Sequence, residues 1–333
     1  MAPPIPPPLP PRPPGAPDIA LVLPLDAPAY ARAAAAVRDG FLAAADAAGA
    51  RQRCTVVSHA ADGVITAFDS ARDRGARVIV GPLVRDDLKT IAIAGGRWPV
   101  TLALNQLDDG TPLPPQTYSL ALAVESDARV LAARAASDGV RSLAVVEGDS
   151  PLTHRLAAAF AGDWVASGAA APTSYVYDPG AASLGELRKS LSHDAPDAAL
   201  LALDAQQAAQ VKPFMGAVAG YASGLLFDRP GPAAARDLEG VRVTEIPWIL
   251  TPDAPAFAGI ARVSYASDAE TRLYALGVDA FRVAQAFVAG VPEHLALDGA
   301  VGALALDADR QFTRTALIGV YRAGELVPLD AAH

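Results

Sequence analysis

Short apolar runs alternate along the chain with longer stretches that carry apolar residues at helical spacing. The first such pair occupies residues 18–49. Residues 19–23 are apolar without interruption and Pro24 follows them, which is typical of a strand buried on both faces in a parallel sheet. The stretch after it predicts a long helix that ends at Gly49. One face of this helix holds residues spaced by three and four, namely Tyr30, Ala34, Val37, Phe41, Ala45 and Ala48.

Gly40 lies inside this predicted helix, where glycine costs about 1 kcal/mol relative to alanine. We interpret it as a sign of close packing between that helical turn and the sheet.

The same alternation continues through two series of about 100 residues each. Further strands are predicted at 51–58, 75–83, 98–105, 117–122, 141–147, 173–177, 197–204, 241–250, 299–306 and 315–321. Further helices are predicted at 61–73, 85–94, 126–137, 152–167, 183–192, 206–218, 255–264 and 269–289. Strands that alternate with helices imply parallel sheets with right-handed crossovers.

The predicted fold class is therefore α/β, with two doubly wound parallel-sheet lobes and a cleft between them. We expect residues 18–122 and part of 238–290 to form the first lobe. The second lobe is expected to contain residues 123–237 and about 291–330. Residues 1–17 contain ten prolines and predict a disordered linker, which suggests that a segment upstream, such as a signal sequence, has been removed.

Composition narrows the function classes. Hydrophobic residues make up 52% of the 333 residues, enough for a large core, and the net charge is −9. The chain has no Lys/Arg-rich stripe, which argues against nucleic-acid binding, and no apolar run long enough to span a membrane. Its single cysteine, Cys54, cannot form an internal disulfide and is expected to be a small buried side chain.

The sequence gives no support for catalysis. The histidines at 59, 154, 193, 294 and 333 show no metal-ligand spacing with cysteines or carboxylates. No nucleophile elbow, phosphate-binding loop or dinucleotide fingerprint follows a predicted strand. We therefore expect no catalytic residues, no cofactor and no metal.

Three residues at the ends of first-lobe strands are candidates for lining the cleft. Clefts in α/β sheets form at the carboxyl ends of strands, where Pro24 and Asn105 are expected. Arg85 follows the third strand and could bind a carboxylate through two parallel hydrogen bonds. The alternatives are a solvated Arg85 and an Asn105 that only caps its loop.

Three weaker candidates are expected in the second lobe, and a fourth near a crossover between the lobes. Glu147, Asp149 and Ser150 lie between a predicted strand and a predicted helix, where they could face the cleft. The alternative is that Asp149 or Ser150 caps the helix. Trp248 lies near a predicted crossover between the lobes and could line the cleft or a partner surface; the simplest alternative is a core position.

The helix predicted at 269–289 has an apolar stripe, so its first role is structural. Arg272, Tyr274 and Asp279 lie outside that stripe. Their face of the helix is expected to be either solvated or available to a partner.

Several motifs, taken in order, resemble one known family. They are residues 19–25, 37–42, 80–83, 102–105, 245–250, 272–282 and 298–307. Across residues 18–329 the chain resembles the LppC/LpoA family of penicillin-binding-protein activator lipoproteins, which have the type I periplasmic-binding-protein fold. The N-terminal helical-repeat domain of better-known members and the acylated cysteine of a lipoprotein have no counterpart in this sequence.

The resemblance implies a periplasmic protein, anchored to the outer membrane in its full-length precursor, that binds and stimulates a bifunctional peptidoglycan synthase. An alternative is a solute receptor that closes its lobes on a metabolite such as an amino acid. Amino-acid receptors of this fold present Ser/Thr hydroxyls after the third and fourth strands, and here residues 81–87 and 102–105 lack them. The sequence therefore favours the regulator.

Overall fold

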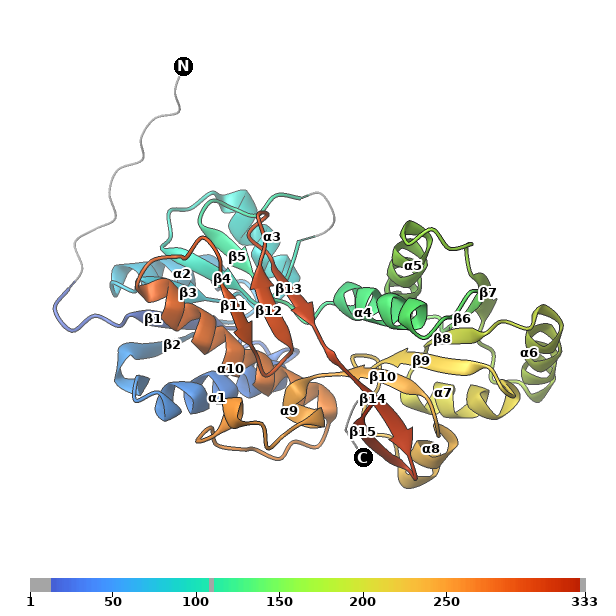
Figure 1. Cartoon of the computed structure of the whole chain (residues 1–333). Coiled ribbons are helices and arrows are strands. Elements are labelled where there is room, and N and C mark those ends of the chain that lie inside the picture. The colour runs from blue at the N-terminus through green and yellow to red at the C-terminus, as the bar shows by residue number, and fades with distance from the viewer. Residues whose placement is uncertain (1–12, 108–110, 330–333) are drawn as a thin grey trace, which may run out of the picture.

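The structure is a computed structural model that describes residues 13–107 and 111–329. It contains two α/β lobes that lie side by side and are joined by three chain segments (Figure 1). This confirms the predicted fold class. Most of the predicted linker lies outside the described residues, and residues 13–17 contain no helix or strand.

The first lobe is built on a five-stranded parallel sheet of order β2-β1-β3-β4-β5. Its strands are β1 (Ile19–Leu23), β2 (Cys54–Ser58), β3 (Val78–Val80), β4 (Val100–Ala103) and β5 (Thr117–Ser119). Its helices are α1 (Ala31–Ala47), α2 (Val64–Asp73), α3 (Arg85–Ala94), α9 (Pro247–Leu250) and α10 (Asp268–Val288), with short 3-10 turns at Arg51–Arg53 and Pro255–Phe257.

Successive residues of β1 face opposite sides of this sheet, which explains the uninterrupted apolar run. Leu21 packs in the cluster that contains α1 and α10, whereas Val22 packs against α2. Cys54 is buried, as predicted, and burial raises the pKa of its thiol to about 11.

The second lobe is built on a seven-stranded sheet of order β15-β14-β10-β9-β8-β6-β7. Its strands are β6 (Leu143–Glu147), β7 (Thr173–Val176), β8 (Ala198–Ala202), β9 (Ala219–Ser223), β10 (Arg242–Glu245), β14 (Leu317–Arg322) and β15 (Glu325–Pro328). Its helices are α4 (Val124–Ser137), α5 (Pro151–Ala166), α6 (Ala181–Asp194), α7 (Ala205–Val211) and α8 (Pro232–Asp237), with a 3-10 turn at Lys212–Phe214. Strands β6 to β10 are parallel, and β14 and β15 are antiparallel additions.

A small antiparallel sheet differs from the predicted division of the chain, which assigned about 291–330 to the second lobe. It consists of β11 (Ala296–Asp298), β12 (Ala303–Leu306) and β13 (Phe312–Thr315). Leu304 and Phe312 pack in the first-lobe core, and Gln311 forms a bridge with Ser119 at the edge of β5. Only β14 and β15 from that range join the second lobe. The difference arises because antiparallel strands pair with each other and leave one apolar face, which here packs on the first lobe.

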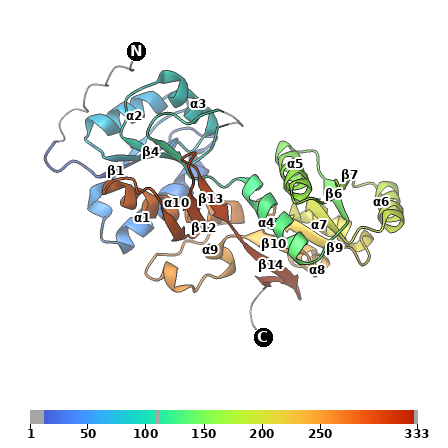
Figure 2. The same cartoon turned by 45° about the horizontal axis from the view of Figure 1, so that its top comes forward.

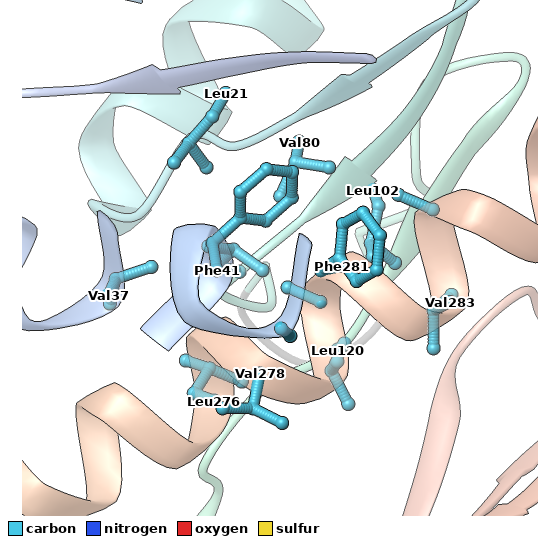
Figure 3. Packing of buried hydrophobic residues seen from close by; sticks show 14 of the residues in the cluster. Leu21, Val37, Phe41, Val80, Leu102, Leu120, Leu276, Val278, Phe281 and Val283 are labelled. Atoms are coloured by element: carbon cyan, nitrogen blue, oxygen red, sulfur yellow. The ribbon is translucent and has the colours of Figure 1, made fainter. Parts of the chain in front are cut away.

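Helices α1 and α10 pack against each other and against one face of the first-lobe sheet (Figure 3). Phe41 and Phe281 meet edge to face with ring centroids 5.4 Å apart. A Cβ atom added at Gly40 would lie only 1.9 Å from the Tyr274 carbonyl oxygen, and one at Gly277 only 2.1 Å from the Val37 carbonyl oxygen. The reason for Gly40 is therefore close approach to α10 rather than to the sheet. Tyr30, predicted on the buried face of α1, lies at the N-cap position and is exposed.

Local secondary structure differs from the sequence prediction in several places, and α8, β11 and β13 are among the elements that were not predicted. Strand β9 was not predicted, because its small residues follow no strong pattern. Residues 241–250 were predicted to be extended, but the strand ends at Glu245 and Pro247 begins the short helix α9. Residues 255–264 were predicted to be helical, but only Pro255–Phe257 forms a 3-10 turn.

Candidate functional site at the junction of the lobes

The three connecting segments follow β5, β10 and β13, so the junction combines residues from distant parts of the chain (Figure 2). Several charged side chains are buried there. Burying a charged group is costly unless the group is paired and hydrogen-bonded. The partners of these side chains therefore show which segments are held together at the junction.

Asp127, in the first turn of α4, is the centre of the junction. One carboxylate oxygen, Oδ1, forms an ion pair with Arg314 of β13. The other, Oδ2, accepts hydrogen bonds from Ser223 Oγ at 2.5 Å and Thr244 Oγ1 at 2.7 Å. Asp127 and Arg314 are 1% and 2% exposed. A single buried carboxylate therefore ties the small sheet of the first lobe to α4, β9 and β10 of the second.

Glu245 and Arg272 form a second buried pair at the end of β10. Arg272 of α10 donates from Nε at 3.1 Å and from Nη2 at 2.5 Å to the two oxygens of Glu245. Its Nη1 donates to the carbonyl oxygen of Phe227, in the second lobe, at 2.8 Å. Such two-point contacts fix the orientation of both side chains. Arg272 thus connects a first-lobe helix to a second-lobe loop.

Asp279, in the middle of α10, holds the connection between β11 and β12. Its two oxygens accept hydrogen bonds from the backbone N–H groups of Ala300 and Val301, both at 2.8 Å. The carbonyl oxygen of Val301 accepts a hydrogen bond from Arg314 Nη1 at 3.3 Å. The Asp279 contacts are therefore continuous with the Asp127 cluster.

Burial raises the pKa of the Asp279 carboxyl to about 6, and the two backbone hydrogen bonds and the nearby Arg282 guanidinium only partly oppose this effect. Because the folded-state pKa lies above the ordinary value of 3.8, protonation favours the folded state. This contribution to stability is fully present below about pH 3.8 and is lost as the pH rises through about 6.

We expect the difference in unfolding free energy between the wild-type chain and Asp279→Asn to change by about 1 kcal/mol from pH 5 to pH 7.5, with the wild type losing stability relative to the variant. Urea unfolding followed by circular dichroism at both pH values measures it. The comparison with the variant cancels the titration of all other groups. Parallel pH profiles of the two proteins would contradict the assignment to Asp279.

The sequence did not identify this junction. From the sequence we expected the face of α10 that carries Arg272, Tyr274 and Asp279 to be solvated or open to a partner. All three residues are buried. The signal available in the sequence was the presence of charged residues within predominantly apolar segments. Their partners come from β10 and from the 299–302 turn, which no local pattern connects to α10.

The predicted first-lobe candidates lie at the carboxyl edge of the five-stranded sheet. Pro24 is buried just after β1, and Arg85 is the half-buried first residue of α3. Asn105 follows β4, where its Nδ2 donates to the Leu83 carbonyl oxygen and its Oδ1 accepts from the Gln106 N–H, both at 2.9 Å. These two contacts correspond to the loop-capping alternative for Asn105.

The second-lobe candidates lie after β6. Ser150 is the N-cap of α5, and its Oγ accepts a hydrogen bond from the Thr153 N–H at 3.2 Å. Glu147 is half-buried with His154 Nδ1 3.5 Å from its Oε2, and Asp149 is exposed.

Trp248 is separate from both groups. It is 3% exposed and packs against Phe257 and Tyr274 beneath α10, with the Arg262 guanidinium over its ring. The indole is therefore a core side chain and does not line an open surface.

Four cavities of the described chain can be compared with these seven residues, and none of the four is lined by any of them. One cavity of about 630 Å³ in the second lobe is lined mainly by residues 204–206 and 228–234. Another of about 200 Å³ adjoins the Glu245–Arg272 pair. None of the seven lines either cavity, or the cavities of about 420 Å³ beside β11–β13 and about 30 Å³ beside Cys54.

The junction is suited to holding two lobes in a defined orientation. Its carboxylates are occupied by guanidinium, hydroxyl and backbone N–H donors. Within residues 13–107 and 111–329, no group of three or more His, Cys, Asp or Glu side chains is arranged to hold a metal ion. Among the described helices, none combines the length and the apolar character needed to cross a bilayer.

Known proteins with a similar sequence or a similar structure were compared with this chain. The chain is 28% identical over 327 residues to the penicillin-binding protein activator LpoA of Mannheimia succiniciproducens, covering 94% of this chain and 55% of that protein. Among solved structures, the LpoA (YraM) C-domain from Haemophilus influenzae, described as a regulator of PBP1A, superposes with a TM-score of 0.78 at 23% identity, covering 93% of this chain and 99% of that one. A putative branched-chain amino acid ABC transporter from Chromobacterium violaceum superposes with a TM-score of 0.79 at 34% identity. The match covers 91% of this chain and 99% of that one.

The chain spans about half the length of the curated relatives it matches, 44% to 55% of each. A family model described as LppC putative lipoprotein matches residues 15–324, which includes both lobes and all three connecting segments. This chain therefore belongs to the LppC family of putative lipoproteins.

Proposed function

We propose that this chain is a non-catalytic periplasmic regulator that binds and activates a bifunctional peptidoglycan synthase of the penicillin-binding-protein class. The observation that carries the proposal is the family match over residues 15–324, together with curated relatives that are named penicillin-binding protein activators. In the cell, the full-length precursor would be held at the outer membrane by a lipid anchor.

The junction of the lobes supports a regulator that acts through its surface. A ligand-trapping receptor needs lobes that close, whereas here buried ion pairs and hydrogen bonds link the lobes at Asp127 and Arg272. Asn105 and Ser150, two of the polar candidates at the strand ends, are engaged in capping contacts with their own loops.

Activation would then follow from differential affinity. A protein that binds the active conformation of the synthase more tightly than its inactive conformation shifts the population toward the active one. No chemistry is required of the regulator.

A second candidate function is a solute receptor for a small metabolite such as an amino acid. One observation favours it: a structure described as a putative branched-chain amino acid ABC transporter is 34% identical over almost the whole chain. A receptor would show saturable binding of one metabolite that stabilises the folded protein.

A peptidoglycan synthesis assay tests the main proposal. Purified bifunctional synthase from the same organism is assayed with and without this chain, and binding of the two proteins is measured by titration in parallel. We expect stimulation of synthesis, with micromolar or tighter binding. Absence of both effects would contradict the proposal, and a thermal-shift screen of amino acids would then test the receptor alternative.

A further inference from the structure

The segment between α9 and α10, residues 251–266, is a long connection in an otherwise compact lobe; we call it the 251–266 loop. Apart from the 3-10 turn Pro255–Phe257, it contains no helix or strand. Figures 1 and 2 both show it projecting outward from the layer formed by α1, α9 and α10. Connections in compact domains are commonly about 4–6 residues long, and longer ones are usually functional or disordered.

This loop is held in place at its base. Phe257 is 5% exposed and meets Trp248 with ring centroids 5.1 Å apart. The Arg262 guanidinium lies 4.3 Å from the centroid of the Trp248 ring, and its Nη2 donates to the carbonyl oxygen of Pro252. Trp248 is thus covered by two separate parts of the loop.

Helix α10 supplies two further anchors. The Tyr274 hydroxyl donates to the carbonyl oxygen of Ala261, and Arg282 Nη2 donates to that of Ala256. Ordering the backbone of one residue costs about 1–2 kcal/mol of conformational entropy. The four contacts that join the loop to Trp248 and α10 therefore fix it at considerable cost in entropy.

The anchored loop presents its remaining surface to solvent. Val263 is 44% exposed, and Pro255, Ala256 and Ala258 are also exposed. Residues 261–264 are exposed and form no helix, strand or turn. The outer face of the loop therefore consists of small apolar side chains and accessible backbone.

Arg262 gives this surface its charge. Its guanidinium contacts an aromatic ring and a carbonyl oxygen, and it forms no ion pair with a carboxylate in the described chain. The other charged side chain of the loop belongs to Asp253, which directly follows Pro252, and no ion pair between Asp253 and Arg262 is formed in the described chain. A partner with an apolar patch for Val263 and a carboxylate for Arg262 would complement this surface.

We propose that the 251–266 loop is the surface through which this chain docks on its protein partner, the synthase of the proposed function, and that the partner presents an apolar patch beside an acidic group. This inference rests on the proposed function. The anchors keep the loop in its binding conformation, which lowers the entropy that docking would otherwise lose.

Binding titrations of the purified synthase with four forms of this chain test the proposal. They are the wild type, Val263→Asp, Arg262→Ala and the control Val176→Asp, which makes the same change at a 75% exposed valine on β7 of the second lobe. We expect Val263→Asp and Arg262→Ala each to weaken binding at least tenfold and Val176→Asp to leave it unchanged. Arg262→Ala should also reduce the salt dependence of the affinity, because it removes an intermolecular charge pair.

The outcomes separate this inference from the proposed function. If the wild-type chain neither binds nor stimulates the synthase, the proposed function fails and the docking proposal fails with it. If the wild type binds and Val263→Asp binds equally well, or if Val176→Asp weakens binding as much, only the docking proposal is overturned. Thermal melting of each form shows whether it is folded. If Arg262→Ala destabilises the loop because the guanidinium no longer covers the Trp248 ring, Val263→Asp still tests the proposal.

Discussion

Replacing Arg314 by methionine is expected to lower the free energy of unfolding by about 3 kcal/mol or more, because it leaves the buried Asp127 carboxylate without its countercharge. The hydroxyls of Ser223 and Thr244 still donate to Asp127, so the loss should fall at the lower end of the range for broken buried pairs. Urea unfolding followed by circular dichroism at pH 7 measures the change.

Arg32→Met is the matched control, since Arg32 forms an equally well-defined ion pair with Glu270 at 2.8 Å but is 81% exposed. Its removal should cost less than about 1 kcal/mol. Adding Asp127→Asn to Arg314→Met should restore part of the lost stability by removing the unpaired charge. Equal effects of Arg314→Met and Arg32→Met would mean that the junction is not held by its buried charges.

Gly40→Ala is expected to destabilise the protein by about 2 kcal/mol, although alanine favours helices over glycine by about 1 kcal/mol. The added methyl group would lie 1.9 Å from the Tyr274 carbonyl oxygen, which is backbone and cannot rotate away. Helices α1 and α10 would have to separate, and the contact between Phe41 and Phe281 would loosen. The midpoint of urea unfolding reports the change.

Gly162→Ala is the matched control, because Gly162 lies inside α5 and an added Cβ there would have no neighbour within 4 Å. It should raise the unfolding free energy by up to about 1 kcal/mol. The two substitutions are chemically identical and should differ in sign. A stabilising effect of Gly40→Ala would show that the helices do not approach as closely as described.

The fold was largely predictable because its signals are local. The uninterrupted apolar run at β1 and the three- and four-residue spacing of Val37 and Phe41 each identify an element without knowledge of the rest of the chain. Repetition of that pair along the chain then defines parallel sheets. Strand β9 (Ala219–Ser223) was missed because its place in the sheet depends on pairing with β8 and β10 rather than on its own residues.

The junction was not predictable for a related reason. Asp279 and Arg272 are charged, and a pattern of polarity assigns charged residues to solvent or to a partner. Their burial is explained by the N–H groups of Ala300 and Val301 and by Glu245, which are distant in sequence. For Asn105 and Ser150 the capping alternatives stated from the sequence match the contacts observed, since caps, like helices, are local.

The pairing of α1 with α10 also bears on how the chain is made. Helix α1 is synthesised early, yet the surface that covers it belongs to Asp268–Val288, so the apolar face of α1 stays uncovered until most of the chain has emerged. Domains generally fold as units during synthesis, but here the first lobe cannot close before most of the second lobe, up to β10, has been made. Nascent chains shorter than about 270 residues should therefore depend on chaperones, whereas the second-lobe strands β6 to β9 can assemble as soon as they appear.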